Sequence, residues 1–161
     1  MNIEGGHRLK NIIFQSRDLC LRTLDTNSLC AKSVRRNGEK VEKNQSLEMA
    51  KLVIDALEDK KAEDIRVIDI SEVSVIADYF IIAGGSNRSQ IQALCDNVEE
   101  KLGRGGYPAK QIEGYDTANW ILLDFGDVIV HIFDKENRLL YDLERIWRDG
   151  RQTDVEQIKN A

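Results

Sequence analysis

The sequence has no long apolar run and no apolar leader, and both absences exclude classes of protein. No stretch approaches the roughly 18 apolar residues that suggest a membrane-spanning helix. The opening residues, MNIEGGHRLK, lack the apolar segment of a secretory signal. These features predict a cytoplasmic protein.

Cysteine is scarce and unpaired. The three cysteines, Cys20, Cys30 and Cys95, are widely spaced and form no CxxC motif. The spacing supports neither a disulfide framework nor a zinc site. We therefore interpret the thiols as reduced and mainly structural.

Composition and charge indicate one soluble globular domain with a basic extension. The chain has 161 residues, of which 42% are hydrophobic and 32% are charged, as in ordinary globular domains. Residues 1–44 hold nine Lys/Arg against five Asp/Glu, whereas residues 45–161 hold 14 against 23, a net charge of −9. An acidic surface repels phosphate backbones and favours a basic protein partner over nucleic acid.

Residues 1–44 show no sustained periodicity, and we interpret them as a flexible extension. An organellar targeting segment is an alternative, although Glu4, Asp18 and Asp25 argue against it. A third interpretation is that translation begins near Met49, so that the native protein lacks the extension.

Regular patterns begin at Ser46 and predict a sheet covered by helices. A first amphipathic helix is followed by apolar strands at 65–70 and 78–83. A second helix ends at the glycines of residues 103–106, and a short edge strand follows at 110–113. After a hairpin, the spacing predicts one last helix and a polar tail at 151–161. The last helix is marked by Leu139, Leu140, Leu143, Ile146 and Trp147.

The most informative segment is the hairpin at residues 114–133, GYDTANWILLDFGDVIVHIF. A two-residue turn at Gly126 and Asp127 places Trp120 opposite Phe133 and Asp124 opposite Ile129. One face is then wholly apolar and should be core. It consists of Ile121, Leu123, Phe125, Val128, Val130 and Ile132.

The second hairpin face mixes large apolar groups with an acid and an imidazole. This composition is typical of a partner-binding surface with aromatic anchors, and equally of a sheet face that a helix covers. The hairpin alone does not separate the two interpretations. The face consists of Trp120, Leu122, Asp124, Ile129, His131 and Phe133.

Known catalytic patterns do not assemble in this sequence. The turn at residues 84–86, Gly-Gly-Ser, could bind an anion at a helix N-terminus, but it lacks the P-loop lysine and the third glycine of a dinucleotide fingerprint. It resembles the opening of the nucleotidyltransferase signature, yet Asp124 and Asp127 are three residues apart and are separated by the turn. His131 has no nucleophile beside it, which favours a hydrogen-bonded structural role. We predict no catalytic residue, metal ion or cofactor.

Four blocks together resemble the ribosomal silencing factor family, also called the Iojap family. They are ALEDKKAEDIRVIDIS at 56–71, ADYFIIAGGSNRSQ at 77–90, EGYDTANWILLDFGDVIVHIF at 113–133 and YDLERIW at 141–147. The resemblance covers about residues 46–150. It implies a domain at 45–150 with a mixed β-sheet flanked by helices, a nucleotidyltransferase-like fold without the catalytic acids.

The resemblance also implies a binding function and a partner. Family members bind ribosomal protein number fourteen of the large subunit, block joining of the small subunit when nutrients are scarce, and often form dimers. A metal-dependent nucleotidyltransferase and a large-subunit assembly factor are the alternatives. The hairpin supplies the predicted partner contacts, which are Trp120, Leu122, Asp124, Phe125, Asp127 and His131.

Overall fold

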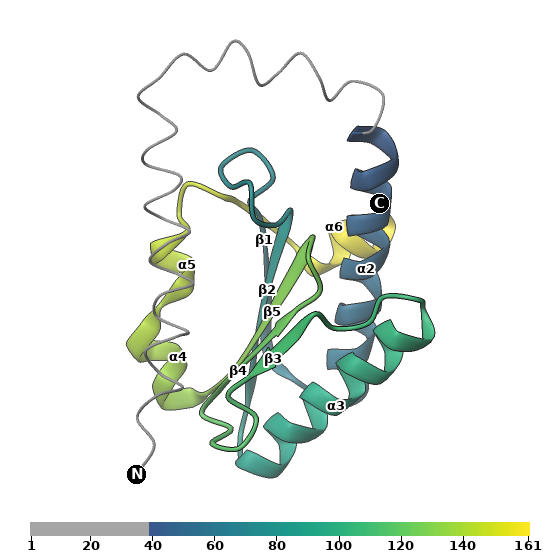
Figure 1. The fold of residues 1–161 in the computed structure, drawn as a ribbon. Helices are drawn as coiled ribbons and strands as arrows, with labels where there is room; N and C mark the ends of the chain where they lie inside the picture. Colours follow the sequence, from purple (N-terminus) through teal and green to yellow (C-terminus); the bar gives the residue numbers. More distant parts are fainter. Residues whose placement is uncertain (1–38) are drawn as a thin grey trace.

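The computed structural model describes residues 39–161, where two helical layers enclose one β-sheet (Figure 1). Helices and strands follow one another as α2 (Glu39–Asp59), β1 (Glu63–Asp69), β2 (Tyr79–Gly85), α3 (Arg88–Arg104), β3 (Gln111–Glu113), β4 (Trp120–Asp124), β5 (Val128–Asp134), α4 (Lys135–Tyr141), α5 (Leu143–Ile146), β6 (Arg151–Thr153) and α6 (Val155–Asn160).

The sheet is mixed, as predicted. Its six strands run in the order β3-β4-β5-β2-β1-β6. Strands β2 and β5 pair in parallel, and the other neighbouring strands pair antiparallel. All seven residues of β2 are buried, because this central strand has helices on both of its faces.

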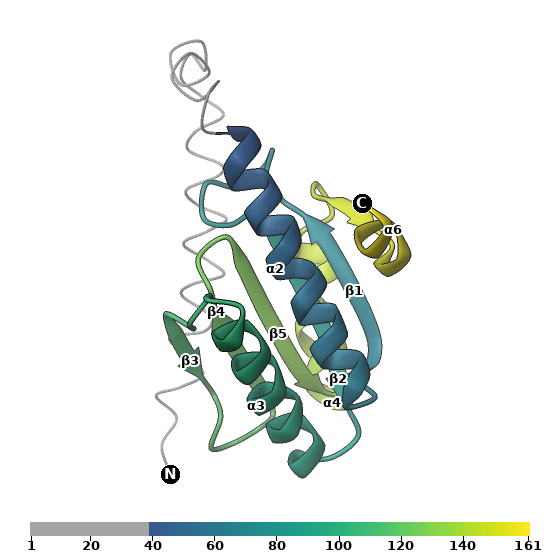
Figure 2. The ribbon, with the colours of Figure 1, turned by 90° about the vertical axis from the view of Figure 1, so that its right-hand side faces the viewer.

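Helices α2 and α3 lie side by side over one face of the sheet (Figure 2). The predicted apolar stripe of α3 is buried, and Asn87 caps this helix by accepting a hydrogen bond from the Gln90 amide at 2.9 Å. The apolar side chains of α2 and α3 join the first hairpin face in one core cluster. Helices α4 and α5 lie on the opposite face of the sheet (Figure 1).

Helix α2 begins earlier than the sequence pattern predicts. It starts at Glu39, so residues 39–44 of the predicted extension are helical, while residues 1–38 lie outside the described residues. Ser46 is fully buried, and its hydroxyl donates a hydrogen bond to the Asp78 carboxylate. A chain that began at Met49 would lack this contact between the helix and the start of β2.

The prediction of one last helix is wrong. Asp142 adopts the left-handed conformation, with φ 37° and ψ 62°, and divides the segment into α4 and α5. Because the break reorients the chain, Leu143 and Trp147 are buried, whereas Leu139 and Leu140 are 77% and 74% exposed. The two exposed leucines therefore do not continue the apolar stripe.

The predicted polar tail is also part of the fold. Residues Arg151–Thr153 form β6 against β1, and α6 follows with Ile158 buried at 3% exposure. The Lys159 ammonium donates to the Glu58 carboxylate of α2. The sequence pattern did not predict this strand because three residues are too few to show alternation.

Candidate partner-binding surface

The hairpin pairs in the predicted register. Trp120 lies opposite Phe133 and Asp124 lies opposite Ile129. The turn is closed by a hydrogen bond from the Phe125 amide to the Val128 carbonyl at 3.0 Å. Gly126 has φ +93°, and its amide donates to the Asp124 carboxylate at 2.7 Å. Asp124 thus has a structural role in the turn.

The second hairpin face is buried and packs with Tyr141 of α4 and with Leu143 of α5, in line with the alternative interpretation that the sequence left open. Trp120, Leu122 and Phe133 pack in a cluster with the side chains of Leu143 and Trp147. Of the six predicted contacts, Asp127 is exposed and Asp124 is partly exposed. The other four, Trp120, Leu122, Phe125 and His131, are at most 5% exposed. Their direct contact with a partner stays a prediction.

His131 lies at the centre of this buried face as a hydrogen-bonded structural residue. The Trp120 indole N–H donates to His131 Nδ1 at 3.1 Å, so the neutral ring carries its proton on Nε2. Within the described part of the chain, Nε2 has no hydrogen-bond partner. The Phe80 ring lies perpendicular to the His131 ring, at a centroid distance of 5.3 Å. Burial lowers the pKa of His131 from 6.5 to about 3.

The lowered pKa of His131 predicts a loss of stability in mild acid. In the unfolded chain this histidine binds a proton near pH 6.5, but in the folded protein only near pH 3. The contribution of His131 to the free energy of unfolding is therefore fully present above pH 6.5. It falls as the pH decreases, by about 2 kcal/mol at pH 5. Urea unfolding between pH 7.5 and pH 5 measures this slope. His131→Phe should flatten it, and equal slopes in both proteins would contradict the assignment.

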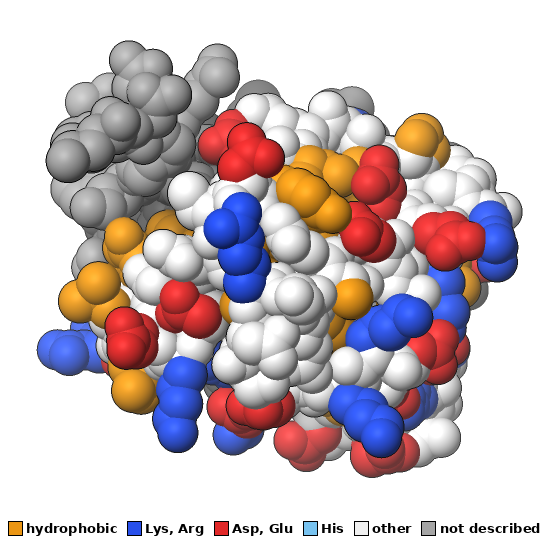
Figure 3. Space-filling view, turned by 90° about the horizontal axis from the view of Figure 1, so that it is seen from below, with side chains coloured by type: hydrophobic (Ala, Val, Ile, Leu, Met, Phe, Trp, Pro, Cys, Tyr) orange, Lys and Arg blue, Asp and Glu red, His pale blue; other side chains and the backbone are white. Residues whose placement is uncertain are grey.

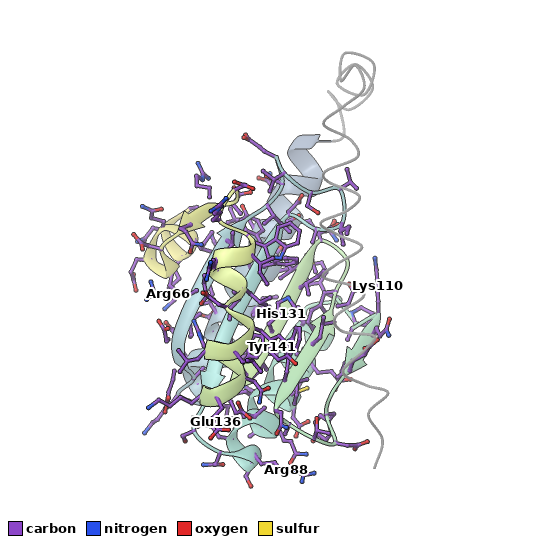
Figure 4. The ribbon with its side chains drawn as sticks, turned by 90° about the vertical axis from the view of Figure 1, so that its left-hand side faces the viewer. Arg66, Arg88, Lys110, His131, Glu136 and Tyr141 are labelled. Atoms are coloured by element: carbon purple, nitrogen blue, oxygen red, sulfur yellow. The ribbon has the colours of Figure 1, made fainter. Side chains whose placement is uncertain are left out.

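Polar and aromatic contacts hold α4 on the sheet. The Arg138 guanidinium, whose side chain is 13% exposed, contacts Glu144 at 2.8 Å and Asp64 at 3.1 Å. The Tyr141 ring lies 4.6 Å from the Trp120 ring, measured between centroids. Figure 4 shows Tyr141 between α4 and the hairpin strands. Sequence analysis missed Arg138, because its partner Asp64 is distant in the chain.

The Gly84–Ser86 turn is an ordinary strand-to-helix connection. A Cβ atom at Gly85 would lie 2.6 Å from Ile91 Cγ1, so glycine allows close packing of α3 on β2. The Ser86 amide donates to the Gln90 side chain at 2.8 Å, which uses a group that an anion would need. In residues 39–161, no cluster of three His, Cys, Asp or Glu side chains could hold a metal ion.

The hairpin side of the domain is acidic. Residues 111–134 contain five Asp/Glu and no Lys or Arg. Glu113 on β3 lies opposite Leu122, and Asp124 follows two residues later on the same face of β4. We call Glu113, Asp124 and Asp127 the acidic strip. Lys110 is the nearby cation, because a Cβ atom at Gly126 would lie 2.4 Å from its Nζ.

Together these features define a mixed α/β domain with an aromatic cluster beside a short helix and an acidic edge next to it. The family model described as "Ribosomal silencing factor during starvation" matches residues 43–161. This range includes every strand of the sheet and every helix from α3 onward. The chain belongs to the ribosomal silencing factor family.

Similar sequences and a similar solved structure support membership of this family. Ribosomal silencing factor RsfS of Bacillus subtilis is 40% identical over 106 residues, which cover 66% of this chain and 90% of that protein. A crystal structure of a Chromobacterium violaceum protein superposes with a TM-score of 0.62 at 36% identity, covering 66% of this chain and 88% of that one. The mouse protein named "Mitochondrial assembly of ribosomal large subunit protein 1" is 29% identical over 99 residues, 60% of this chain and 43% of that protein.

The described residues contain no helix that is long and apolar enough to span a membrane.

Proposed function

We propose that this protein is a cytoplasmic factor that binds the large ribosomal subunit through ribosomal protein number fourteen. By occupying the face that meets the small subunit, it keeps the subunits apart and represses translation when nutrients are limiting. The observation that carries this proposal is the family match over residues 43–161. The name of that family refers to silencing of ribosomes during starvation.

Charge supports a ribosomal protein as the partner. Residues 45–161 have a net charge of −9, whereas ribosomal proteins are generally basic. Opposite fields raise the association rate. The same negative charge reduces adhesion to the phosphate backbone of ribosomal RNA.

A role in large-subunit assembly is a second candidate function. The mouse relative is named for assembly of the mitochondrial large subunit. Both functions require binding to the large subunit, and they differ in the stage at which the protein binds. The same surface could serve either function.

Co-sedimentation with purified ribosomal subunits tests the binding step. We expect the protein to sediment with large subunits and not with small subunits. Isolated ribosomal protein number fourteen, added in excess, should compete for the protein and leave it in the supernatant. Binding to both subunits alike, or to neither, would contradict the proposal.

A further inference from the structure

Two adjacent leucines on α4 are exposed and do not pack in the hydrophobic core. Leu139 and Leu140 are 77% and 74% exposed, more than any other large hydrophobic side chain that the structure describes. We call this pair the leucine ridge. Figure 3 shows hydrophobic side chains gathered at its left-hand edge, on the side of the molecule where α4 lies. Adjacent exposed apolar groups of this kind mark interaction sites more often than isolated ones.

The helix that carries the ridge is held by other residues. None of the seven residues of α4 is buried, and a helix of this length is not stable by itself. Asp134 caps it by accepting a hydrogen bond from the Asn137 amide at 2.7 Å. Arg138 and Tyr141 attach it to neighbouring elements. The ridge is therefore presented in a defined position, which lowers the entropic cost of binding through it.

The acidic strip borders the same face of the sheet. Glu113 faces Leu122 across β3 and β4, and Leu122 belongs to the buried cluster against which Tyr141 packs. Helix α4 and the acidic strip thus flank one side of the hairpin. Figure 4 shows α4 and the β3 edge, marked by Lys110, on either side of the hairpin strands.

We infer that the leucine ridge is the apolar centre of the contact with the large-subunit protein, and that the acidic strip is its charged border. The inference rests on the proposed function and names the surface that performs it. The occupant is a basic protein face with an apolar recess. Charge complementarity selects it, because residues 110–135 hold five Asp/Glu against two Lys, a net charge of −3. An apolar centre within a polar rim is the usual anatomy of such interfaces.

The buried hairpin residues then have a positioning role. The Trp120 ring stacks on Phe133 at 4.9 Å and contacts Tyr141 at 4.6 Å, both measured between ring centroids. Tyr141 directly follows Leu140 in the chain. Trp120 thus supports the helix that presents the ridge, without itself facing the partner.

The double substitution Leu139→Ala and Leu140→Ala tests the ridge. Alanine preserves helix propensity, and the exposed leucines contribute little to stability. We expect an unchanged melting temperature and binding to large subunits weakened by about tenfold or more. Val75→Ala is the control for loss of exposed apolar area away from the ridge. Val75 is 68% exposed in the loop between β1 and β2, which meets the hairpin turn through the hydrogen bond from the Asp78 amide to the Asp127 carbonyl and lies at the opposite end of the domain from α4 (Figure 1). This variant should bind as the wild type does.

A second variant tests the charged border. Glu113→Gln with Asp127→Asn should slow association with large subunits, and the difference should shrink as salt rises. Asp124 is left intact because it accepts the hydrogen bond from the Gly126 amide. Equal association rates for this variant and the wild type at low salt would contradict the role of the acidic strip as the charged border of the contact.

The outcomes separate this inference from the proposed function. If the wild type binds large subunits and the double leucine variant binds equally well, the inference fails and the proposed function stands. If the wild type binds no large subunits, both fail. Sedimentation velocity adds a further check. Loss of self-association in the leucine variant with unchanged subunit binding would assign the ridge to a contact between two copies, and would overturn the inference.

Discussion

Trp120→Ala should lower the free energy of unfolding by about 3 to 5 kcal/mol. The Trp120 side chain is 5% exposed and packs on Phe133 and Tyr141. Its removal leaves a cavity under α4 and deprives His131 Nδ1 of the indole donor at 3.1 Å. Urea unfolding followed by circular dichroism measures the change, and thermal melting should show a large fall in melting temperature.

Trp120→Phe is the matched control for this experiment. It retains a ring under Tyr141 and loses the hydrogen bond, so we expect a smaller loss of about 1 to 3 kcal/mol. Binding to large subunits should weaken in the alanine variant together with its stability, because α4 loses the support of the Trp120 ring. A Trp120→Ala protein with wild-type stability and abolished binding would contradict burial of this residue and identify it as a direct contact.

Gly114→Ala should be similarly damaging, with a loss of about 3 kcal/mol or more. Gly114 has φ +82°, and an added Cβ atom would lie 2.0 Å from the Trp120 carbonyl oxygen. Both the strained conformation and the backbone overlap oppose alanine. Because the overlap involves the first residue of β4, we expect the start of the hairpin to shift. Chemical denaturation of the variant measures the cost.

Alanine substitutions at two other glycines distinguish the cost of backbone strain from the cost of atomic overlap. Gly106 has φ +88°, yet an added Cβ atom meets nothing within 4 Å, so Gly106→Ala should cost only the strain of about 1 to 2 kcal/mol. Gly103 lies in the last turn of α3 with open space around it, and Gly103→Ala should stabilise by roughly 0.5 to 1 kcal/mol. Equal losses of stability in Gly114→Ala and Gly106→Ala would show that the overlap with the Trp120 carbonyl oxygen contributes nothing.

The sequence was sufficient for the parts of the fold that depend on neighbouring residues. The two-residue turn and the alternation of side chains predicted the hairpin register correctly, from Trp120 opposite Phe133 to Asp124 opposite Ile129. Helical spacing likewise predicted the buried stripes of the first two helices. In each case the pattern is repeated often enough along the chain to determine the element and its buried face.

The cover of the second hairpin face could not be predicted in the same way. Leu139 and Leu143 have helical spacing, but Asp142 takes the left-handed conformation between them, and no local pattern marks that break. Arg138 reaches Asp64 on β1, a contact that only the tertiary fold creates. The spacing therefore predicted Leu139 and Leu140 in one continuous helix with Leu143, and Trp120 stayed open to a surface role.

The nature of the second hairpin face illustrates why composition alone does not identify a binding site. Trp120, Leu122 and His131 are residue types that occur both in interfaces and beneath helices. Burial of all three places them in the core, and the exposed leucines lie on the helix above. The comparison with nucleotidyltransferase folds stays a prediction.

The measurement that tests the central claim most directly is a subunit-joining assay on a sucrose gradient. Purified large and small subunits are mixed at a magnesium concentration that allows them to join, with and without an excess of this protein. We predict that the protein keeps the subunits in separate peaks and migrates with the large one. An undiminished peak of joined ribosomes, with the protein bound to the large subunit or free, would contradict the proposed block of subunit joining.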